Sequence, residues 1–247
     1  MKKKIFVMLI ALAMTVGILS GCTEETITKA NFEFSSEDSY VGTEFSFTDK
    51  STGNGLTYEW DFNGDGEVDS TDKNPKYTFD DPGTYTVKLT ITDENDKTSE
   101  YTKEIVITLK DIITTAIDAG FNTLATALTT ANLVETLQGE GPFTVFAPTD
   151  TAFAAVNQTW LTSLLEDTTN LTKVLTYHVL SGTFMSTDLS NTTVETIEGS
   201  NLSITINSTG VYVDNIMVTT ADIECSNGII HIIGSVLIPE TVEGPIE

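Results

Sequence analysis

The sequence contains no arginine. Its 12 basic residues are all lysines, against 36 aspartates and glutamates, and the formal net charge is −24. Proteins that bind nucleic acid neutralise its phosphates with lysine and arginine side chains. A surface this acidic repels phosphate and favours solubility and association with cations, so nucleic-acid binding is excluded.

Cysteine is nearly absent as well. Cys22 and Cys225 are the only two, and if Cys22 is modified at the N-terminus, no internal disulfide can form. The rest of the chain must then be stabilised by hydrophobic cores. We interpret Cys225 as a small buried apolar residue, with an intermolecular disulfide as the alternative.

Common catalytic motifs are also missing. The sequence has no G-x-S-x-G and no H-E-x-x-H, and its two histidines, His178 and His231, lie far apart without metal-ligand spacing. Paired carboxylates for glycoside hydrolysis would need a pattern, whereas the abundant acids have the scatter of a solvated surface. We therefore predict that the protein is not an enzyme, with a carbohydrate-active enzyme as a remote alternative.

The first 21 residues have the pattern of an export signal. Three lysines precede an apolar run at 5–19, which is shorter than the ~20 residues that a membrane-spanning helix needs. Ser20 and Gly21 directly before Cys22 resemble the lipobox of prokaryotic lipoproteins. That resemblance implies cleavage before Cys22, a diacylglyceryl group on its sulfur, and a membrane anchor that holds the protein in the cell envelope, outside the cytoplasm. A plain secreted protein or an uncleaved anchor is the alternative.

A polar tether at 22–30 precedes a region of alternating hydrophobicity at 31–108. Period-two alternation, with turn signals between the runs, predicts half-buried strands and a small β-sandwich. The alternating apolar residues are Phe32, Phe34, Phe45, Phe47, Tyr58, Trp60, Phe62, Tyr85, Val87, Leu89, Ile91, Ile105 and Ile107.

The same region carries a family resemblance. YEWDFNGDG (58–66), NPKYTF (74–79) and DPGTYTVKLTITDENDKT (81–98) occur in this order and resemble the PKD domain. The resemblance implies an immunoglobulin-like β-sandwich that is not catalytic. Such domains serve extracellular proteins as spacers or as modules that contact proteins and carbohydrates.

After residue 109 the apolar spacing changes to that of helices. Helical spacing covers 111–137 and 171–180, a short apolar strand lies at 141–148, and Thr149 or Asp150 could cap the helix that follows the strand. The chain then returns to strands. Helices followed by strands predict an α+β domain.

Three blocks of this second region also carry a resemblance. GPFTVFAPTDTAFAAV (141–156), LTYHVLSG (175–182) and NGIIHIIGSVLIP (227–239) resemble the fasciclin-like domain, in the family's order and over residues 109–240. The resemblance implies an extracellular adhesion module that binds surface proteins or polysaccharides. Residues 241–247 are interpreted as a tail.

One acidic loop of the first region has the spacing of a calcium site. The EF-hand loop takes its ligands from positions 1, 3, 5, 7, 9 and 12, with glycine at position 6. Counted from the first aspartate, the predicted Ca²⁺ ligands are Asp61, Asn63, Asp65, the Glu67 carbonyl, Asp69 and Asp72. The flanks read as strand, so the loop is not an EF-hand, and the ion would be structural. The alternative is an acidic turn in which Asp and Asn side chains bond their own backbone.

Both histidines are interpreted as buried and hydrogen-bonded, because His178 lies on an apolar helix face and His231 alternates with isoleucines. The fasciclin resemblance adds weak binding candidates. It associates Tyr177 and His178, and the segment that keeps Asp222 and Ile223, with contacts to partner proteins.

Taken together, the patterns predict a lipid-anchored cell-surface protein. An immunoglobulin-like sandwich is the spacer, and an α+β fasciclin-like domain binds protein or polysaccharide ligands. The alternative is a structural envelope or surface-layer protein that binds the host's own envelope.

Overall fold

The computed structural model describes residues 27–36 and 38–244. The predicted signal peptide at 1–21, the lipidation site Cys22 and most of the predicted tether lie outside these residues, as does the end of the predicted tail. In the described part of the chain, no helix has the length and hydropathy needed to span a membrane.

The first domain is a sandwich of two antiparallel three-stranded sheets, with strand orders β1-β2-β4 and β3-β5-β6. The predicted all-β sandwich is confirmed. The strands are β1 (Phe32–Ser35), β2 (Glu44–Asp49), β3 (Thr57–Asp61), β4 (Lys76–Thr78), β5 (Gly83–Thr92) and β6 (Thr98–Ile107).

Aromatic rings form the centre of this sandwich. Trp60 is fully buried, and its ring lies 5.1 Å from that of Phe32 and 5.6 Å from that of Phe47. Alternation along the strands points these rings to the space between the sheets. Most of the predicted alternating residues are buried here, whereas Phe34, Tyr58 and Tyr85 are half-buried at the margin of the core.

Six helices open the second domain: α1 (Ile112–Asp118), α2 (Asn122–Thr130), α3 (Val134–Gln138), α4 (Asp150–Ala155), α5 (Gln158–Glu166) and α6 (Thr168–Tyr177). The stretch at 111–137 is three helices, because Gly120 (φ +84°) and Asn132 (φ +55°) end α1 and α2 in the left-handed conformation. Thr149 caps α4 as predicted, with its hydroxyl accepting from the Ala152 N–H.

A seven-stranded sheet follows, in the order β8-β7-β13-β12-β11-β10-β9, with β7 and β13 parallel and the other pairs antiparallel. The predicted helical stretch at 171–180 is wrong at its end, where the chain turns into β8. The strands are β7 (Phe143–Pro148), β8 (Val179–Ser181), β9 (Thr192–Glu195), β10 (Asn201–Asn207), β11 (Gly210–Val213), β12 (Ile216–Cys225) and β13 (Gly228–Ile233).

The sheet curls toward a barrel. The Ile197 N–H, just beyond β9, donates to the Val179 carbonyl of β8 over 2.8 Å, which joins the two edges of the sheet. Side chains alternate between two cores: Val145 of β7 packs with the helices, and Phe146 lies in the interior of the curled sheet. The predicted α+β class is confirmed.

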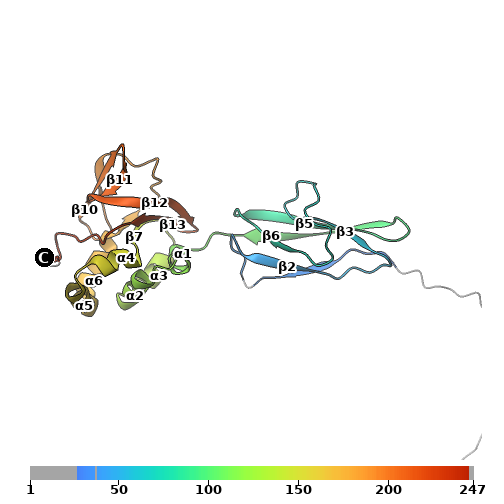
Figure 1. The fold of residues 1–247 in the computed structure, drawn as a ribbon, viewed down its shortest axis with the longest axis horizontal. Helices are drawn as coiled ribbons and strands as arrows, with labels where there is room; N and C mark the ends of the chain where they lie inside the picture. The colour runs from blue at the N-terminus through green and yellow to red at the C-terminus, as the bar shows by residue number, and fades with distance from the viewer. Residues whose placement is uncertain (1–26, 37, 245–247) are drawn as a thin grey trace, which may run out of the picture.

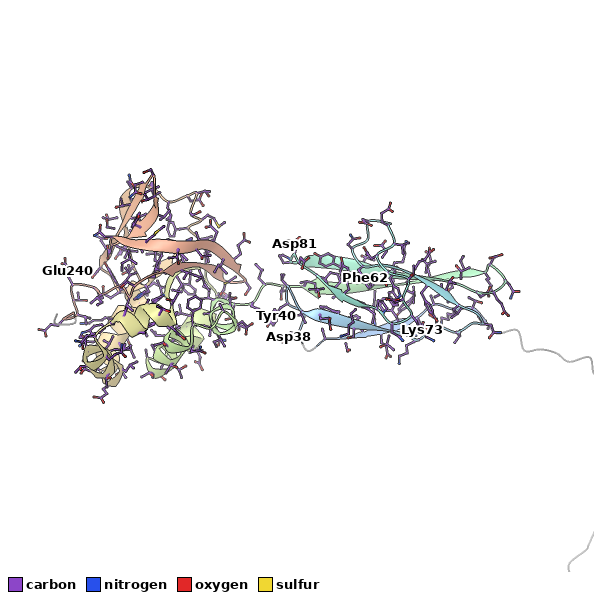
Figure 2. The ribbon with its side chains drawn as sticks, viewed as in Figure 1. Asp38, Tyr40, Phe62, Lys73, Asp81 and Glu240 are labelled. Carbon is purple, nitrogen blue, oxygen red and sulfur yellow. The ribbon has the colours of Figure 1, made fainter. Side chains whose placement is uncertain are left out.

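The two domains lie end to end (Figure 1). Thr108 pairs with Tyr40 at one end of the sandwich, whereas Lys29 pairs with Thr52 at the entry to β1, so the chain enters and leaves the first domain at opposite ends. At the junction, the Lys110 ammonium bonds the Asp118 carboxylate and lies 5.8 Å from the centre of the Tyr40 ring. Tyr40 is seen at this junction in Figure 2.

Candidate functional site

The acidic loop after β3 is held by hydrogen bonds to its own backbone. The Asp61 carboxylate accepts from the Gly64 N–H over 2.7 Å and from the Gly66 N–H over 3.1 Å. Two further turns follow, in which Asn63 Oδ1 accepts from the Asp65 N–H and Asp65 Oδ1 accepts from the Glu67 N–H. Bonds of this kind are typical of aspartate and asparagine in turns.

The second half of the loop folds back onto the core. Asp69 Oδ2 accepts from the Phe62 N–H over 2.6 Å, and the indole N–H of buried Trp60 donates to the Asp72 carbonyl over 2.8 Å. The Glu67 N–H, followed by the Asn63 amide, lowers the pKa of Asp65 below its usual range. These bonds hold the loop in a fixed conformation against Trp60.

These bonds correspond to the acidic turn rather than to a formed metal cage. Among the residues described by the structure, no three His, Cys, Asp or Glu side chains are grouped so as to hold a metal ion. Val68, the apolar residue at position eight of the predicted loop, is 51% exposed. Calcium at Asp61, Asn63, Asp65, Glu67, Asp69 and Asp72 stays a prediction.

Tyr177 and His178 lie inside the domain, with only 5% and 2% of their surfaces exposed. The Tyr177 hydroxyl donates to Asp214 Oδ2 over 2.5 Å and lies 3.1 Å from the Asn201 carbonyl. Burial, and then the bond to Asp214, raise the pKa of Tyr177. The tyrosine joins the end of α6 to the curled sheet.

His178 joins two other segments. Its Nδ1–H donates to the Val174 carbonyl over 2.7 Å, and its Nε2 accepts from the Leu237 N–H over 2.9 Å. Burial lowers the pKa of His178 to about 4, so the ring is neutral at neutral pH. The predicted structural role of this histidine is confirmed. A ring enclosed in this way cannot contact a partner protein without local opening.

Asp222 and Ile223 are half-buried on a bulge of β12. The Asp222 backbone is left-handed, with φ +61°, and its carboxylate accepts from the Ser186 N–H over 2.7 Å and from the Ser186 hydroxyl. Its own N–H donates to Nδ1 of buried His231, whose Nε2–H donates to the Phe184 carbonyl. The bulge is thus fastened to the loop after β8.

Ser186, Asp222 and His231 lie close together in the structure. Their spacing in the sequence gives no sign of this grouping, and sequence reasoning missed it. The three residue types occur in nucleophilic triads, but the geometry here is different. Ser186 donates to the aspartate, and both ring nitrogens of His231 bond backbone atoms. A triad needs the histidine to accept the serine proton, so these side chains hold the bulge in place.

Among the cavities of the second domain, two are lined by loops or chain ends as well as by regular elements, and sequence reasoning missed both. The larger, about 750 Å³, lies between the 138–142 segment and the hairpin at 224–229, and we call it the junction cavity. The smaller, about 280 Å³, lies between α5, α6 and the C-terminal segment, and we call it the tip cavity. The tip cavity is lined by Trp160, Ser163, Leu164, Asp167, Asn170, Thr241, Val242 and Glu243.

Comparison with known families decides the relationship. The fasciclin domain model matches residues 119–239, and the PKD domain model matches residues 26–109. The uncharacterized protein sll1735 of Synechocystis sp. is 48% identical over 122 residues, which cover 49% of this chain and 91% of that protein. The chain belongs to the fasciclin domain family.

Two further proteins resemble the same part of this chain. Protein sll1483 of Synechocystis sp. is 42% identical over 121 residues, which cover 48% of this chain and 67% of that protein. Human periostin is 34% identical over 123 residues, which cover 49% of this chain but only 15% of periostin. The similarity to these relatives is thus to one fasciclin domain. Fasciclin and PKD domains fit a surface adhesion or binding role, and neither match indicates a catalytic family.

Proposed function

We propose that this protein is a lipid-anchored adhesion protein in which the PKD domain holds the fasciclin domain away from the membrane for binding to surface proteins or polysaccharides. The observation that carries the proposal is the opposite placement of entry and exit in the first domain. A chain anchored at Cys22 would meet the sandwich at its Lys29 end and leave it at Thr108, beside the fasciclin domain.

The connector supports the same arrangement because it is short and bonded on both sides. On the side of the first domain, the Thr108 N–H donates to the Ser39 carbonyl, and the Thr108 carbonyl accepts from the Val41 N–H. On the side of the second domain, the Ser226 N–H donates to the Lys110 carbonyl over 2.9 Å. With the Lys110 ammonium between Tyr40 and Asp118, the spacer would present the fasciclin domain in a defined direction.

Adhesion should require the anchor. We expect bacterial cells that express the chain to bind a surface coated with envelope polysaccharide or matrix protein. A Cys22→Ala variant should take up no labelled fatty acid, because the sulfur that carries the lipid is gone, and cells that release the unlipidated chain should not bind. Fatty-acid labelling and cell retention are the measurements. If wild type and variant are labelled equally, the lipid anchor is wrong.

Direction can be tested with the soluble chain 23–247 coupled to beads through either terminus. Beads coupled at the N-terminus should be retained better, because the fasciclin domain then faces outward. Equal retention in both orientations would contradict the spacer role. Retention only on the host's own envelope would favour the structural envelope protein instead.

We further propose that the acidic loop binds calcium weakly. Four aspartates and Glu67 share this loop, and the Lys88 ammonium lies 4.0 Å from the Asp61 carboxylate. Calcium at ten times its dissociation constant should stabilise the PKD domain by ~1.4 kcal/mol. Thermal unfolding followed by Trp60 emission, in a Trp160→Phe background, measures this effect.

An Asp65→Ala variant separates specific binding from general charge screening. The calcium-induced rise in melting temperature should be lost in this variant. If millimolar calcium leaves the wild-type melting unchanged, the loop is only an acidic turn. A rise that persists in Asp65→Ala would mean that calcium merely screens the acidic surface.

A further inference from the structure

We propose that the tip cavity binds one ring of a neutral saccharide. The inference rests on the proposed function, because it names the ligand class and the contact site of the fasciclin domain. It is carried by the aromatic wall of the cavity, its set of hydrogen-bond acceptors, its charge and its position.

The aromatic wall is Trp160, which is held in place by the C-terminal segment. Its indole N–H donates to the Glu243 carbonyl over 2.7 Å, and Val242 beside it is buried in the helical core. The other tryptophan, Trp60, is fully buried in the PKD domain. Trp160 is only partly buried and lines an open cavity, so part of its ring can contact a ligand.

The acceptors come from the start of α6. Asp167 caps this helix, with Oδ1 accepting from the Thr169 and Asn170 N–H groups over 3.0 and 3.1 Å. Its Oδ2 accepts from the Asn170 Nδ2 over 2.8 Å, which orients the amide and leaves Asn170 Oδ1 as an acceptor. Oδ1 already accepts two bonds, whereas Oδ2 keeps a second lone pair. Asp167 Oδ2 and Asn170 Oδ1 are therefore acceptors held in place before a ligand arrives.

A saccharide matches this set of groups. Sugar hydroxyls donate to carboxylate and amide oxygens, and the C–H face of a pyranose ring is attracted to the negative face of an indole. A cavity of about 280 Å³ lies at the lower end of the volumes of ligand pockets, which suits one ring of a longer chain. No lysine lines the cavity and carboxylates do, so acidic sugars are disfavoured.

The position of the tip cavity agrees with a role in adhesion. Helices α5 and α6 and the C-terminal segment lie at the end of the fasciclin domain that faces away from the PKD domain (Figure 1), and Glu240 marks this end in Figure 2. The junction cavity is larger, but it includes Ser226, which bonds the connector at Lys110, and no aromatic side chain lines it.

The test uses the soluble chain 23–247. The neutral probes are glucose, galactose, mannose, N-acetylglucosamine and a trisaccharide of each, and the acidic probe is glucuronic acid. We expect at least one neutral sugar to give a saturable change in Trp160 emission and saturation-transfer NMR signals, and glucuronic acid to give none. Asparagine caps helices as well as aspartate does, so Asp167→Asn should fold normally. This variant should weaken binding about tenfold, the loss expected for a hydrogen bond to a charged group. Asn170→Ala removes a bond to a neutral amide and should weaken binding by a smaller factor.

Asn95→Ala, in an exposed turn of the PKD domain, is the matched control and should bind like wild type. The proposal is overturned if no probe binds, or if binding is unchanged in both Asp167→Asn and Asn170→Ala. Cell adhesion that persists in Asn170→Ala after sugar binding is lost would overturn this inference alone. If the wild-type protein binds a sugar but cells that display it do not adhere, the proposed function is wrong and this inference stands.

Discussion

Replacing Gly228 by alanine should destabilise the fasciclin domain by about 3 kcal/mol or more, because the new methyl group would overlap main-chain atoms. A Cβ at this position would lie 2.0 Å from the Phe143 carbonyl oxygen and 2.8 Å from its carbon. Gly228 and Phe143 are register partners of the parallel pair β13 and β7, and Gly228 has φ +155°. Backbone atoms cannot rotate away, so the parallel strands β7 and β13 would have to separate.

Gly234→Ala is the matched control for this prediction. An added Cβ there meets nothing within 4 Å, and loss of unfolded-state entropy should leave stability unchanged or raise it by up to ~1 kcal/mol. Urea unfolding followed by Trp160 emission compares the two variants, and failure of Gly228→Ala to give soluble protein also agrees with the prediction. If both variants unfold at the same urea concentration, the close approach of β7 and β13 does not require glycine at position 228, and the prediction is wrong.

Acidification should destabilise the fasciclin domain between about pH 6.5 and pH 4. Burial lowers the pKa of His178 from its ordinary 6.5 to about 4. In this window the unfolded chain binds a proton that the folded chain does not, so stability falls as pH falls and levels off below the folded pKa. The shift corresponds to roughly 3 kcal/mol, and His231, whose pKa burial also lowers, adds in the same direction.

Asp150 and Asp222 lose their protons in a lower pH window than the histidines, which helps to separate the histidine contribution. Hydrogen bonds lower the pKa values of Asp150 and Asp222, so their contribution is lost only below the ordinary range of aspartate. Urea midpoints of wild type and of a His178→Gln, His231→Gln double variant, taken between neutral pH and pH about 4, measure the difference. The double variant should be less stable at neutral pH and nearly flat across the window. A slope equal to that of wild type would contradict the assignment.

Much of the fold could be predicted from local patterns. Period-two alternation placed Phe32, Phe47 and Trp60 in the core of a sandwich, because side chains of a strand point to alternate faces. Helical spacing located five of the six helices but missed α5 (Gln158–Glu166), and it did not locate the helix ends. It overlooked the breaks at Gly120 and Asn132 and extended α6 into β8, because helix ends depend on left-handed caps and strand pairing.

The candidate sites were less predictable, because a site depends on which segments meet in space. The spacing of Asp61, Asn63 and Asp65 located an ordered loop, yet hydrogen bonds to main-chain N–H groups occupy its side chains. Tyr177 and His178 came from a resemblance, and packing places both inside the domain.

The acidic character, the two domain classes and their order follow from composition and periodicity, because these are local properties of the chain. Which residues face outward depends on the tertiary structure. It buried His178 against Leu237, fastened Asp222 to Ser186, and brought Trp160 beside Asp167 and the C-terminal segment. It also placed the two ends of the PKD domain apart. Each of these contacts joins segments that only the folding of the chain brings together.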